Sequence, residues 1–347
     1  MSNHKKPIKA AIIVVAYGHE TSIGNTLDAI AEDKYAQDSV ILVDNHPQHR
    51  CAAIAKTHKA VDHVVESDNH GFGAGCNLGA NYAKEADMLY FLNPDAVPQK
   101  NFLSEIKKAY ADRPEWKAWM SLLLLPNGKV NSAGNVVHLS GLSWVLGYGK
   151  PASDYTVPME VTSLSGACLA IRKSSWDELS GFTTDYFLYY EDTELSSRML
   201  LRGWKMGLWP SSQVLHDYDF KKNNKKWFYL ERNRYVYILS SWPIAVIILL
   251  SPLLLACELG LWLVSLMQRR FLLRLRSFLS FLKIIPSLPR LRRHAQIGRK
   301  ISSRSFASSL AADLHNPFLG RISEIGLISD IFAAYKYLVI ACLKIGR

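Results

Sequence analysis

The N-terminal part of the chain alternates continuous apolar runs with segments of helical periodicity, and this alternation restricts the possible folds more than any other feature. Residues 8–17 form an uninterrupted run rich in β-branched side chains, and residues 21–32 follow with apolar side chains at helical spacing. An uninterrupted apolar run is typical of a strand buried on both faces of a parallel sheet. Similar patterns predict strands at residues 40–43, 61–65, 88–92 and 165–172, a strand ending at His216, and a helix at residues 77–85. Repeated strand–helix units predict an α/β fold with a mostly parallel, doubly wound sheet.

Polar side chains lie at or just after the ends of four predicted strands. They are Tyr17, Asp44, Asn69 and Asp95. Because α/β sheets of this kind bind ligands beyond the carboxyl ends of their strands, we expect a nucleotide at this edge. The alternative for Asp44 and Asn69 is a turn-forming role, to which both residue types are well suited.

A glycine-rich turn precedes the helix predicted at residues 77–85. A turn of this kind at a helix N-terminus suggests phosphate binding. However, Gly71, Gly73 and Gly75 alternate, which does not match the G-x-G-x-x-G spacing of dinucleotide oxidoreductases, and the chain has no Gly-Lys-Ser/Thr P-loop. The sequence therefore favours neither of these nucleotide-binding classes.

Two acidic sites suggest a metal ion and a general base. Glu191 and Asp192 directly follow an aromatic run at residues 187–190, where partial desolvation can hold one carboxylate ionised as a base. Asp95 can bind Mg²⁺ or Mn²⁺ while substrate phosphates supply other oxygens, and His216 is a candidate further ligand. The alternatives are a surface turn for the first site and a structural histidine at position 216.

The positive charge of the chain is concentrated in one segment. Residues 259–312 contain eleven basic and no acidic residues, which equals the whole net charge of +11. The remainder is balanced, so we expect no nucleic-acid partner, and one basic surface that meets an anionic partner.

An apolar stretch precedes this basic segment. Residues 235–257 carry no charge over 23 residues, which is long enough for a helix to span a bilayer. Pro243, Pro252 and Glu258 leave a broken, re-entrant or in-plane arrangement open. The basic residues that follow predict that this flank is cytoplasmic and contacts anionic lipid.

Two further C-terminal segments are apolar. Residues 271–285 predict an interfacial amphipathic helix. Its apolar face is expected to hold Leu272, Leu275, Leu279 and Leu282, with Arg276, Ser280 and Lys283 on another face. Residues 335–343 form a shorter segment that either packs or enters the membrane. We therefore predict a catalytic domain at residues 1–234 and a membrane-associated region at residues 235–347, with membrane contact through residues 235–304.

Short motifs occur along the chain in a recognisable order. They are Val14-Val15-Ala16-Tyr17, Val43-Asp44-Asn45, Asn69-His70-Gly71-Phe72-Gly73 with Asn77 and Gly79, Leu92-Asn93-Pro94-Asp95, Ser165-Gly166-Ala167, Gly181-Phe182, Tyr190-Glu191-Asp192 with Arg198, Arg202-Gly203-Trp204, and His216. This order resembles the inverting family-two glycosyltransferases of the GT-A fold, specifically the rhamnosyltransferase-like branch, over residues 8–235.

The resemblance implies roles for the site residues. Asp192 corresponds to the catalytic base, and Glu191 supports it or contacts the acceptor. Asp95 corresponds to the metal-binding aspartate and His216 to a further ligand of Mg²⁺ or Mn²⁺. Asp44 would bond the pyrimidine of the donor.

The remaining matches would border the nucleotide or the acidic cluster. Tyr17, Asn69, Gly71, Gly73 and Asn93 are expected around the nucleotide. Position 93 is Asn, whereas the metal motif of the family more often reads Asp-x-Asp. Arg198 would pair with the acidic cluster or a phosphate, the alternative being an ion pair on a helix surface.

The resemblance also implies the substrates. The expected acceptor is a polyprenyl-diphosphate-linked saccharide at the cytoplasmic face of the inner (plasma) membrane. The first-choice donor is dTDP-rhamnose, and UDP-hexoses are the alternative. The Gln-x-x-Arg-Trp sequence of processive synthases is absent, so addition of one sugar or a few is favoured. A nucleotidyltransferase is disfavoured because Gly18-His19-Glu20, not a basic glycine-rich loop, follows the first strand. A non-catalytic membrane-anchored scaffold stays open as a further alternative.

Overall fold

The computed structural model describes residues 7–217, 224–314 and 326–345. The chain forms two compact units: Met1–Gly134, Gly147–Leu195 and Lys205–Asp219 make the first, and Asn135–Leu146, Ser196–Trp204 and Phe220–Arg347 the second. The domain boundary expected between residues 234 and 235 stays a prediction. Residues 1–6, 218–223, 315–325 and 346–347 of the two predicted regions lie outside the described part of the chain.

The first unit is built on one large sheet. Its strands are β1 (Ala10–Ala16), β2 (Ser39–Asp44), β3 (His63–Glu66), β4 (Met88–Leu92), β5 (Ala96–Pro98), β6 (Trp116–Leu124), β7 (Val130–Ser132), β10 (Met159–Glu160), β11 (Cys168–Arg172) and β12 (Lys205–His216). Its helices are α1 (Ile23–Asp33), α2 (Arg50–Ala55), α3 (Phe72–Ala80), α4 (Phe102–Asp112) and α5 (Lys173–Leu179), the 3-10 turns η1 (Ala152–Asp154) and η2 (Thr184–Tyr186), and the start of α6 (Glu191–Leu201).

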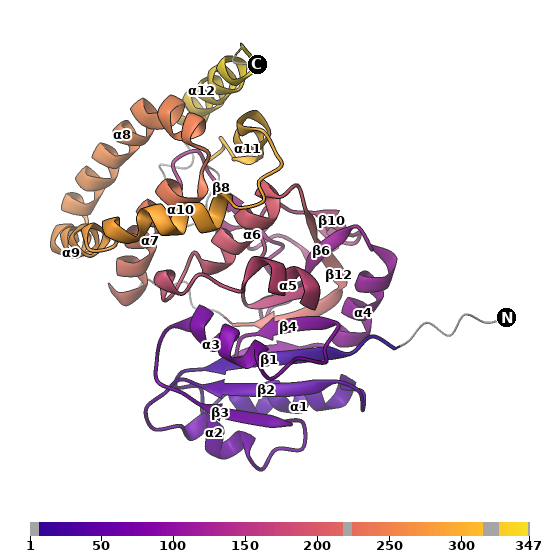
Figure 1. The fold of residues 1–347 in the computed structure, drawn as a ribbon. Helices are drawn as coiled ribbons and strands as arrows, with labels where there is room; N and C mark the ends of the chain where they lie inside the picture. The colour runs from indigo at the N-terminus through magenta and orange to yellow at the C-terminus, as the bar shows by residue number, and fades with distance from the viewer. Residues whose placement is uncertain (1–6, 218–223, 315–325, 346–347) are drawn as a thin grey trace. The chain divides into compact units, whose positions relative to one another are not determined.

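The sheet runs in the order β10-β12-β6-β11-β4-β1-β2-β3 (Figure 1). β1 pairs in parallel with β2 and β4, and β2 with β3. Every side chain of β1 is buried, as expected for a strand covered on both faces. The predicted α/β fold with a mostly parallel sheet is therefore confirmed. Two features were not predicted: strands β5, β6, β7 and β10 have no counterpart among the predicted strands, and β11 runs antiparallel to both of its neighbours, β4 and β6.

Helix α3 begins five residues before its predicted start and includes most of the glycine-rich segment. Gly71 caps it with φ 96°, a conformation that favours glycine. A Cβ atom at Gly75 would lie 2.6 Å from the Val15 side chain, and one at Gly79 would lie 2.5 Å from that of Ile13. These glycines, unfavourable in most helices, allow α3 to approach β1 closely, so packing outweighs helix propensity here.

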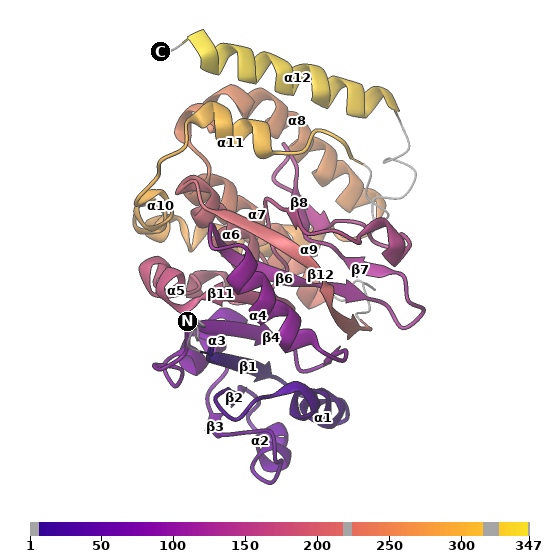
Figure 2. The same ribbon diagram turned by 90° about the vertical axis from the view of Figure 1, so that its right-hand side faces the viewer.

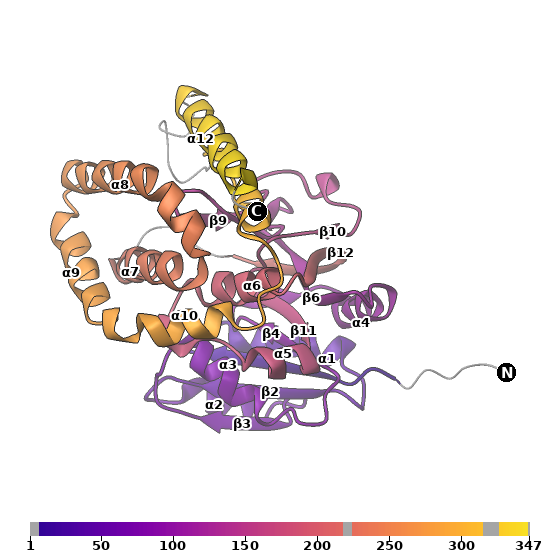
Figure 3. The same cartoon turned by 45° about the horizontal axis from the view of Figure 1, so that its top comes forward.

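The second unit is mainly helical. It contains β8 (Asn135–Val137), β9 (Ser143–Val145), α7 (Asn224–Ser241), α8 (Ile244–Met267), α9 (Phe271–Leu282), η3 (Ile285–Ser287), α10 (Leu288–Gln296), α11 (Ser303–Ser309) and α12 (Gly326–Ile345). Helices α8, α9 and α10 surround α7 on three sides (Figure 3). Helices α8, α11 and α12 pack against one another (Figure 2).

The apolar C-terminal segments differ from their predictions in detail. The run at residues 235–257 is broken at Pro243, which directly precedes α8, whereas Pro252 lies inside that helix. The segment at residues 335–343 belongs to the longer helix α12, which has 20 residues. By length and composition alone, Ile244–Met267 and Gly326–Lys344 could each cross a membrane.

The predicted separation of faces on α9 is wrong. Leu272, Arg276, Leu279 and Lys283 are all exposed, because spacings of three and four residues place them on one side of a helix. The buried side of α9 carries Arg274, Ser277 and Phe281.

Candidate active site

Asp95 and His216 come together at the carboxyl edge of the sheet. Asp95 lies in the turn between β4 and β5, and β5 pairs antiparallel with the end of β12, so that His216 is opposite Ala96. The Asp95 Oδ1 and His216 Nε2 atoms are 3.4 Å apart. Burial raises the pKa of Asp95, but the hydrogen bond and charge of His216, together with the charge of His19, lower it below its ordinary value. The carboxylate is therefore held ionised.

This pair has the chemistry of a partial site for a divalent metal. Carboxylate and imidazole both suit Mn²⁺, and carboxylate suits Mg²⁺. Neighbouring donors around an octahedral ion with bonds of about 2.1 Å lie roughly 3 Å apart, close to the 3.4 Å between Asp95 and His216. Within the described residues no group of three or more His, Cys, Asp or Glu side chains could hold a metal. Further oxygens would therefore have to come from the diphosphate of a substrate or from water.

Backbone hydrogen bonds connect Asp192 to the loop of Asp95. The antiparallel strand β11 starts at the edge where β4 ends, and the Asn93 N–H donates to the Ala167 carbonyl at 3.0 Å. The next residue back, Gly166, donates its N–H to Asp192 Oδ2 at 2.9 Å. The Thr193 N–H also donates to Asp192 Oδ1 at 2.6 Å. Two backbone N–H groups, that of Gly166 just before β11 and that of Thr193 in the first turn of α6, thus orient and stabilise the Asp192 carboxylate.

Glu191 and Asp192 occupy different environments although they are adjacent. Glu191 is buried, and its Oε2 atom has no hydrogen-bond partner among the described residues. Burial, with the neighbouring Asp192 charge, raises the pKa of Glu191 to about 8. Asp192 is the more accessible of the two. The pair therefore separates into a carboxyl group that favours its protonated form and an accessible carboxylate.

The loop before these carboxylates has an unusual backbone. Phe187, Tyr189 and Tyr190 have φ values of 62°, 65° and 72°, in the left-handed region that bulky residues rarely adopt. Gly71 packs against this loop, since a Cβ atom there would lie 2.2 Å from the Phe187 carbonyl oxygen, and the Phe72 N–H donates to that oxygen at 2.8 Å. Sequence reasoning missed this strain, because aromatic residues give no signal for a left-handed backbone.

The first turns of α3 hold the same loop from its other end. The Asn77 amide makes two hydrogen bonds with the backbone of Phe182, accepting from its N–H at 2.8 Å and donating to its carbonyl at 2.9 Å. A Cβ atom at Gly73 would lie 3.0 Å from the Phe182 Cβ and 3.8 Å from that of Glu191. Gly71, Gly73 and Asn77 thus position the segment that carries the carboxylates. This role was not predicted from the motifs.

The other predicted nucleotide-binding residues surround the ends of β1 to β3. Asp44 is fully buried, and its two oxygens accept 2.9 Å hydrogen bonds from the N–H groups of His46 and Ala52. Asn69 Oδ1 accepts from the Gly71 N–H at 3.0 Å. Tyr17 is half-exposed with its ring edge-on to His46 at 5.0 Å. Asp44 and Asn69 therefore shape loops at this edge, and their contacts with a nucleotide stay predictions.

Arg198 does not lie on a helix surface. Its side chain on α6 is fully buried, so the alternative of an exposed ion pair is wrong. Arginine side chains are mostly exposed in folded proteins, so the burial of Arg198 is unusual.

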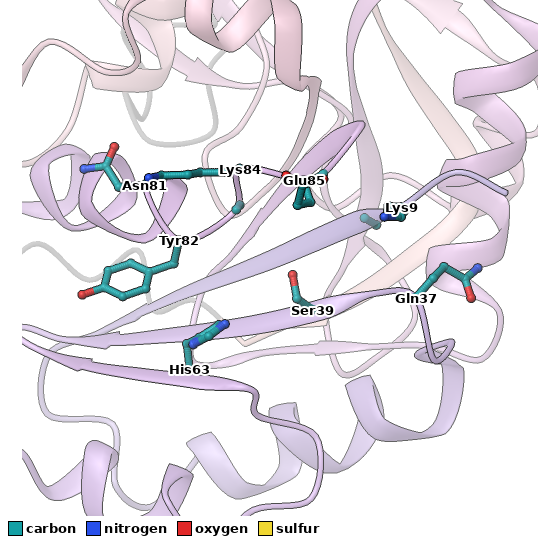
Figure 4. A pocket seen from close by; sticks show the side chains of 11 residues that line it. Lys9, Gln37, Ser39, His63, Asn81, Tyr82, Lys84 and Glu85 are labelled. Atoms are coloured by element: carbon teal, nitrogen blue, oxygen red, sulfur yellow. The ribbon is translucent and has the colours of Figure 1, made fainter. Parts of the chain in front are cut away.

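A separate hollow of about 530 Å³ lies at the opposite edge of the sheet. Figure 4 shows Lys9, Ser39 and His63 along it, from the amino ends of β1, β2 and β3, with Tyr82 and Lys84 from the segment after α3. The candidate catalytic groups lie at the carboxyl edge, so this hollow is not part of their site.

The sequence of the chain is similar to those of glycosyltransferases. Residues 11–124 match the family described as glycosyl transferase family 2, and residues 88–291 match glycosyl transferase family group 2. The chain is 27% identical over 222 residues to rhamnosyltransferase WbbL of Escherichia coli K12, covering 59% of this chain and 82% of that protein. It is 29% identical over 233 residues to N-acetylglucosaminyl-diphospho-decaprenol L-rhamnosyltransferase of Mycobacterium tuberculosis, covering 59% and 75%.

Solved structures support the fold. GalNAc-T7 with UDP, GalNAc and Mn²⁺ matches with a TM-score of 0.56 at 16% identity, covering 69% of this chain and 49% of the other. The mannosyltransferase PcManGT of Pyrobaculum calidifontis with GDP-Man and Mn²⁺ matches with a TM-score of 0.50 at 14% identity, covering 94% and 86%. The fold is therefore of the GT-A type.

The contact between Gly71 and Phe187 predicts a specific sensitivity to one added methyl group. Gly71→Ala should lower the melting temperature more than Gly128→Ala, because both glycines have positive φ but a Cβ atom at Gly128 meets nothing within 4 Å. A left-handed backbone costs alanine about 1–2 kcal/mol, and Gly71, at φ 96° and ψ 169°, lies in a region essentially restricted to glycine, so its backbone cost adds to that of the close approach. Thermal unfolding of both variants measures the difference. Equal losses would show that the close approach of Gly71 to Phe187 does not constrain the loop.

The raised pKa of Glu191 predicts a pH-dependent contribution to stability. The folded chain keeps the Glu191 proton up to about pH 8, whereas the ordinary value of 4.5 applies when unfolded. Folding stability should therefore fall as pH rises between these values, by up to about 1.4 kcal/mol per pH unit, and level off above them. Thermal unfolding from pH 6 to 9 should show a smaller fall for Glu191→Gln than for wild type. Glu66→Gln removes an exposed carboxylate with a lowered pKa and should follow wild type; parallel curves for all three would contradict the assignment.

Proposed function

The chain belongs to glycosyl transferase family 2, and from this premise we propose that it transfers rhamnose from dTDP-rhamnose with inversion at the anomeric carbon. The proposed acceptor is a polyprenyl-diphosphate-linked saccharide used in cell-surface polysaccharide assembly. The names of the relatives support the transferred sugar and the acceptor, since they include rhamnosyltransferases and one whose name contains N-acetylglucosaminyl-diphospho-decaprenol.

One observation carries the proposal. An accessible carboxylate, Asp192, is oriented by the Gly166 N–H, and the neighbouring Ala167 is bonded to the loop that holds Asp95. These contacts support our assignment of a base and of a site for a diphosphate-bound cation to the same edge of the sheet. Single-displacement transfer needs these two functions, one for the incoming hydroxyl and one for the leaving group.

The chemistry follows from these positions. Asp192 accepts the proton of the acceptor hydroxyl while the hydroxyl oxygen forms a bond to the anomeric carbon of the donor. The bond from that carbon to the diphosphate oxygen breaks, and its electron pair leaves with deoxythymidine diphosphate. A single displacement inverts the anomeric configuration. Mg²⁺ or Mn²⁺, held by Asp95 and His216, would neutralise charge on the departing diphosphate.

The neighbouring residues support binding and orientation. Glu191 in its protonated form adds no second negative charge beside Asp192, and it would support the base or contact the acceptor. Asp44 would read the pyrimidine, with Tyr17, Asn69, Gly71, Gly73 and Asn93 bordering the nucleotide.

The proposed location is the cytoplasmic face of the plasma membrane. The support is the basic segment at residues 259–312 and the two helices whose length and composition suit a membrane. An anionic lipid surface and a lipid-linked diphosphate both complement this charge.

Two alternatives have distinct signatures. A UDP-hexose transferase would use UDP-glucose or UDP-galactose in place of dTDP-rhamnose in a transfer assay with the lipid-linked acceptor. A non-catalytic scaffold would bind a nucleotide sugar without turnover.

The assignment of Asp192 predicts a selective loss of turnover. Asp192→Asn keeps an oxygen for the Gly166 N–H but removes the base, so the transfer rate should fall by about 10²- to 10⁴-fold. Donor binding measured by calorimetry should stay close to that of wild type. The matched control is Asp177→Asn, which removes an exposed carboxylate paired with Lys173 on α5 and should keep its rate. An active Asp192→Asn enzyme would remove this residue from the base role.

A further inference from the structure

The second unit carries its large apolar side chains outward. On α8, Ile248, Leu255 and Leu263 are each more than 60% exposed. On α12, Leu327 and Tyr337 are exposed to a similar or greater degree. Such surfaces are costly in water and mark contact with an apolar phase or a partner.

The interior of the same unit contains a cluster of charged side chains among its apolar core residues. Glu258 of α8 pairs with Arg234 of α7 and, at 2.7 Å, with Arg274 of α9, and it accepts a hydrogen bond from Tyr235. Arg274 also pairs with Glu231 of α7 at 2.8 Å. We name these five residues the charge box. It explains how a carboxylate occurs within the apolar helix α8, since its charge is compensated by two buried arginines.

The charge box conflicts with a transmembrane course for α8. Glu258 is fourteen residues after Ile244, which places it about 21 Å along the helix. In a bilayer with a hydrocarbon core of about 30 Å, this depth lies inside the core. Glu231 and Arg234 of α7 and Arg274 of α9 would have to be at the same depth.

The course of α9 and α10 after α8 also conflicts with a transmembrane α8. Arg274 of α9 binds Glu258 in the C-terminal half of α8, whereas Arg292 of α10 donates to the carbonyls of Leu239 and Trp242, just before α8 begins, each at 2.9 Å. Helices α9 and α10 therefore lead back from one end of α8 to the other. On the way they expose basic side chains, Arg276, Lys283, Arg290 and Arg293. A transmembrane α8 would carry these unburied charges through the hydrocarbon.

Helix α12 is attached to polar structure at its middle. Lys336 donates to the carbonyls of Ser308 and Leu310 at the end of α11, and Tyr335 donates to the Leu249 carbonyl of α8 at 3.0 Å. Helix α11 contains four serines and the exposed Arg304. A transmembrane α12 would draw α11 into the core with it.

The composition of the exposed face of α9 suits contact with the surface of a membrane. Leu272 and Leu279 alternate there with Arg276 and Lys283. Leucines can enter the acyl boundary while the long basic side chains reach the headgroups. The charge of this face complements phosphate-bearing lipids.

We propose that α8 and α12 lie along an anionic membrane surface without crossing it, and that the charge box fixes α8 in this in-plane position. The inference rests on the membrane association in the proposed function and not on the transfer chemistry. It selects the in-plane arrangement among those that the sequence leaves open.

Depth measurements on α8 test the proposal. Ile248, Leu255 and Leu263 are replaced singly by cysteine and labelled with bimane, in a background where Cys257 and Cys342 are alanine and the remaining cysteines, Cys51, Cys76 and Cys168, are buried. The labelled full-length proteins are bound to vesicles of phosphatidylglycerol and phosphatidylcholine that carry bromine at shallow or deep acyl positions. Vesicles without bromine and vesicles of phosphatidylcholine alone are the controls.

An in-plane helix should give equal quenching at the three positions, strongest with shallow bromines, and only on vesicles with phosphatidylglycerol. A transmembrane helix would place position 255 about 10 Å deeper than positions 248 and 263, and that profile would overturn the in-plane arrangement while leaving membrane association intact. Failure to bind either vesicle would overturn the membrane association itself. Neither outcome would alter the result expected for Asp192→Asn.

Discussion

Two backbone hydrogen bonds at the start of β11 determine the arrangement of the candidate active site. In one, the Asn93 N–H donates to the Ala167 carbonyl. In the other, the Gly166 N–H donates to the side-chain carboxylate of Asp192. They form because β11 runs antiparallel to β4, which brings the beginning of one strand to the end of the other. In a wholly parallel sheet the residues before β11 would lie at the opposite edge. The direction of this one strand therefore brings the carboxylate of Asp192 to the loop of Asp95.

Close packing stabilises the strained backbone of residues 187–190, which precede Glu191 and Asp192. Three aromatic residues between positions 187 and 190 adopt a left-handed backbone, which costs free energy that the surrounding contacts must supply. Gly71 and Asn77 provide those contacts from α3. The helix that approaches β1 through its glycines is thus the same helix that fixes the loop before Glu191 and Asp192.

Much of this arrangement was predictable because local patterns and topology agree. Buried strands such as β1 and β4 and the end of β12 at His216 follow from apolar runs and from polar residues at their ends. The pairing of Asp95 with His216 follows from the resemblance to a known family. The direction of β11, the early start of α3 and the left-handed loop depend on contacts between distant segments, which periodicity does not encode. For α9, the helix was predicted correctly but its buried face was not, because Arg274 is buried by ion pairs that sequence spacing does not show.

The anomeric configuration of the product tests the central claim most directly. The enzyme is purified and given dTDP-rhamnose and a polyprenyl-diphosphate-linked acceptor. NMR of the product then reports the one-bond coupling between C1 and H1 of the transferred rhamnose. A single displacement assisted by Asp192 predicts a configuration opposite to that of the donor. Retention would require two displacements and a nucleophile that attacks the donor, and would contradict the role of the Asp192 carboxylate as a general base.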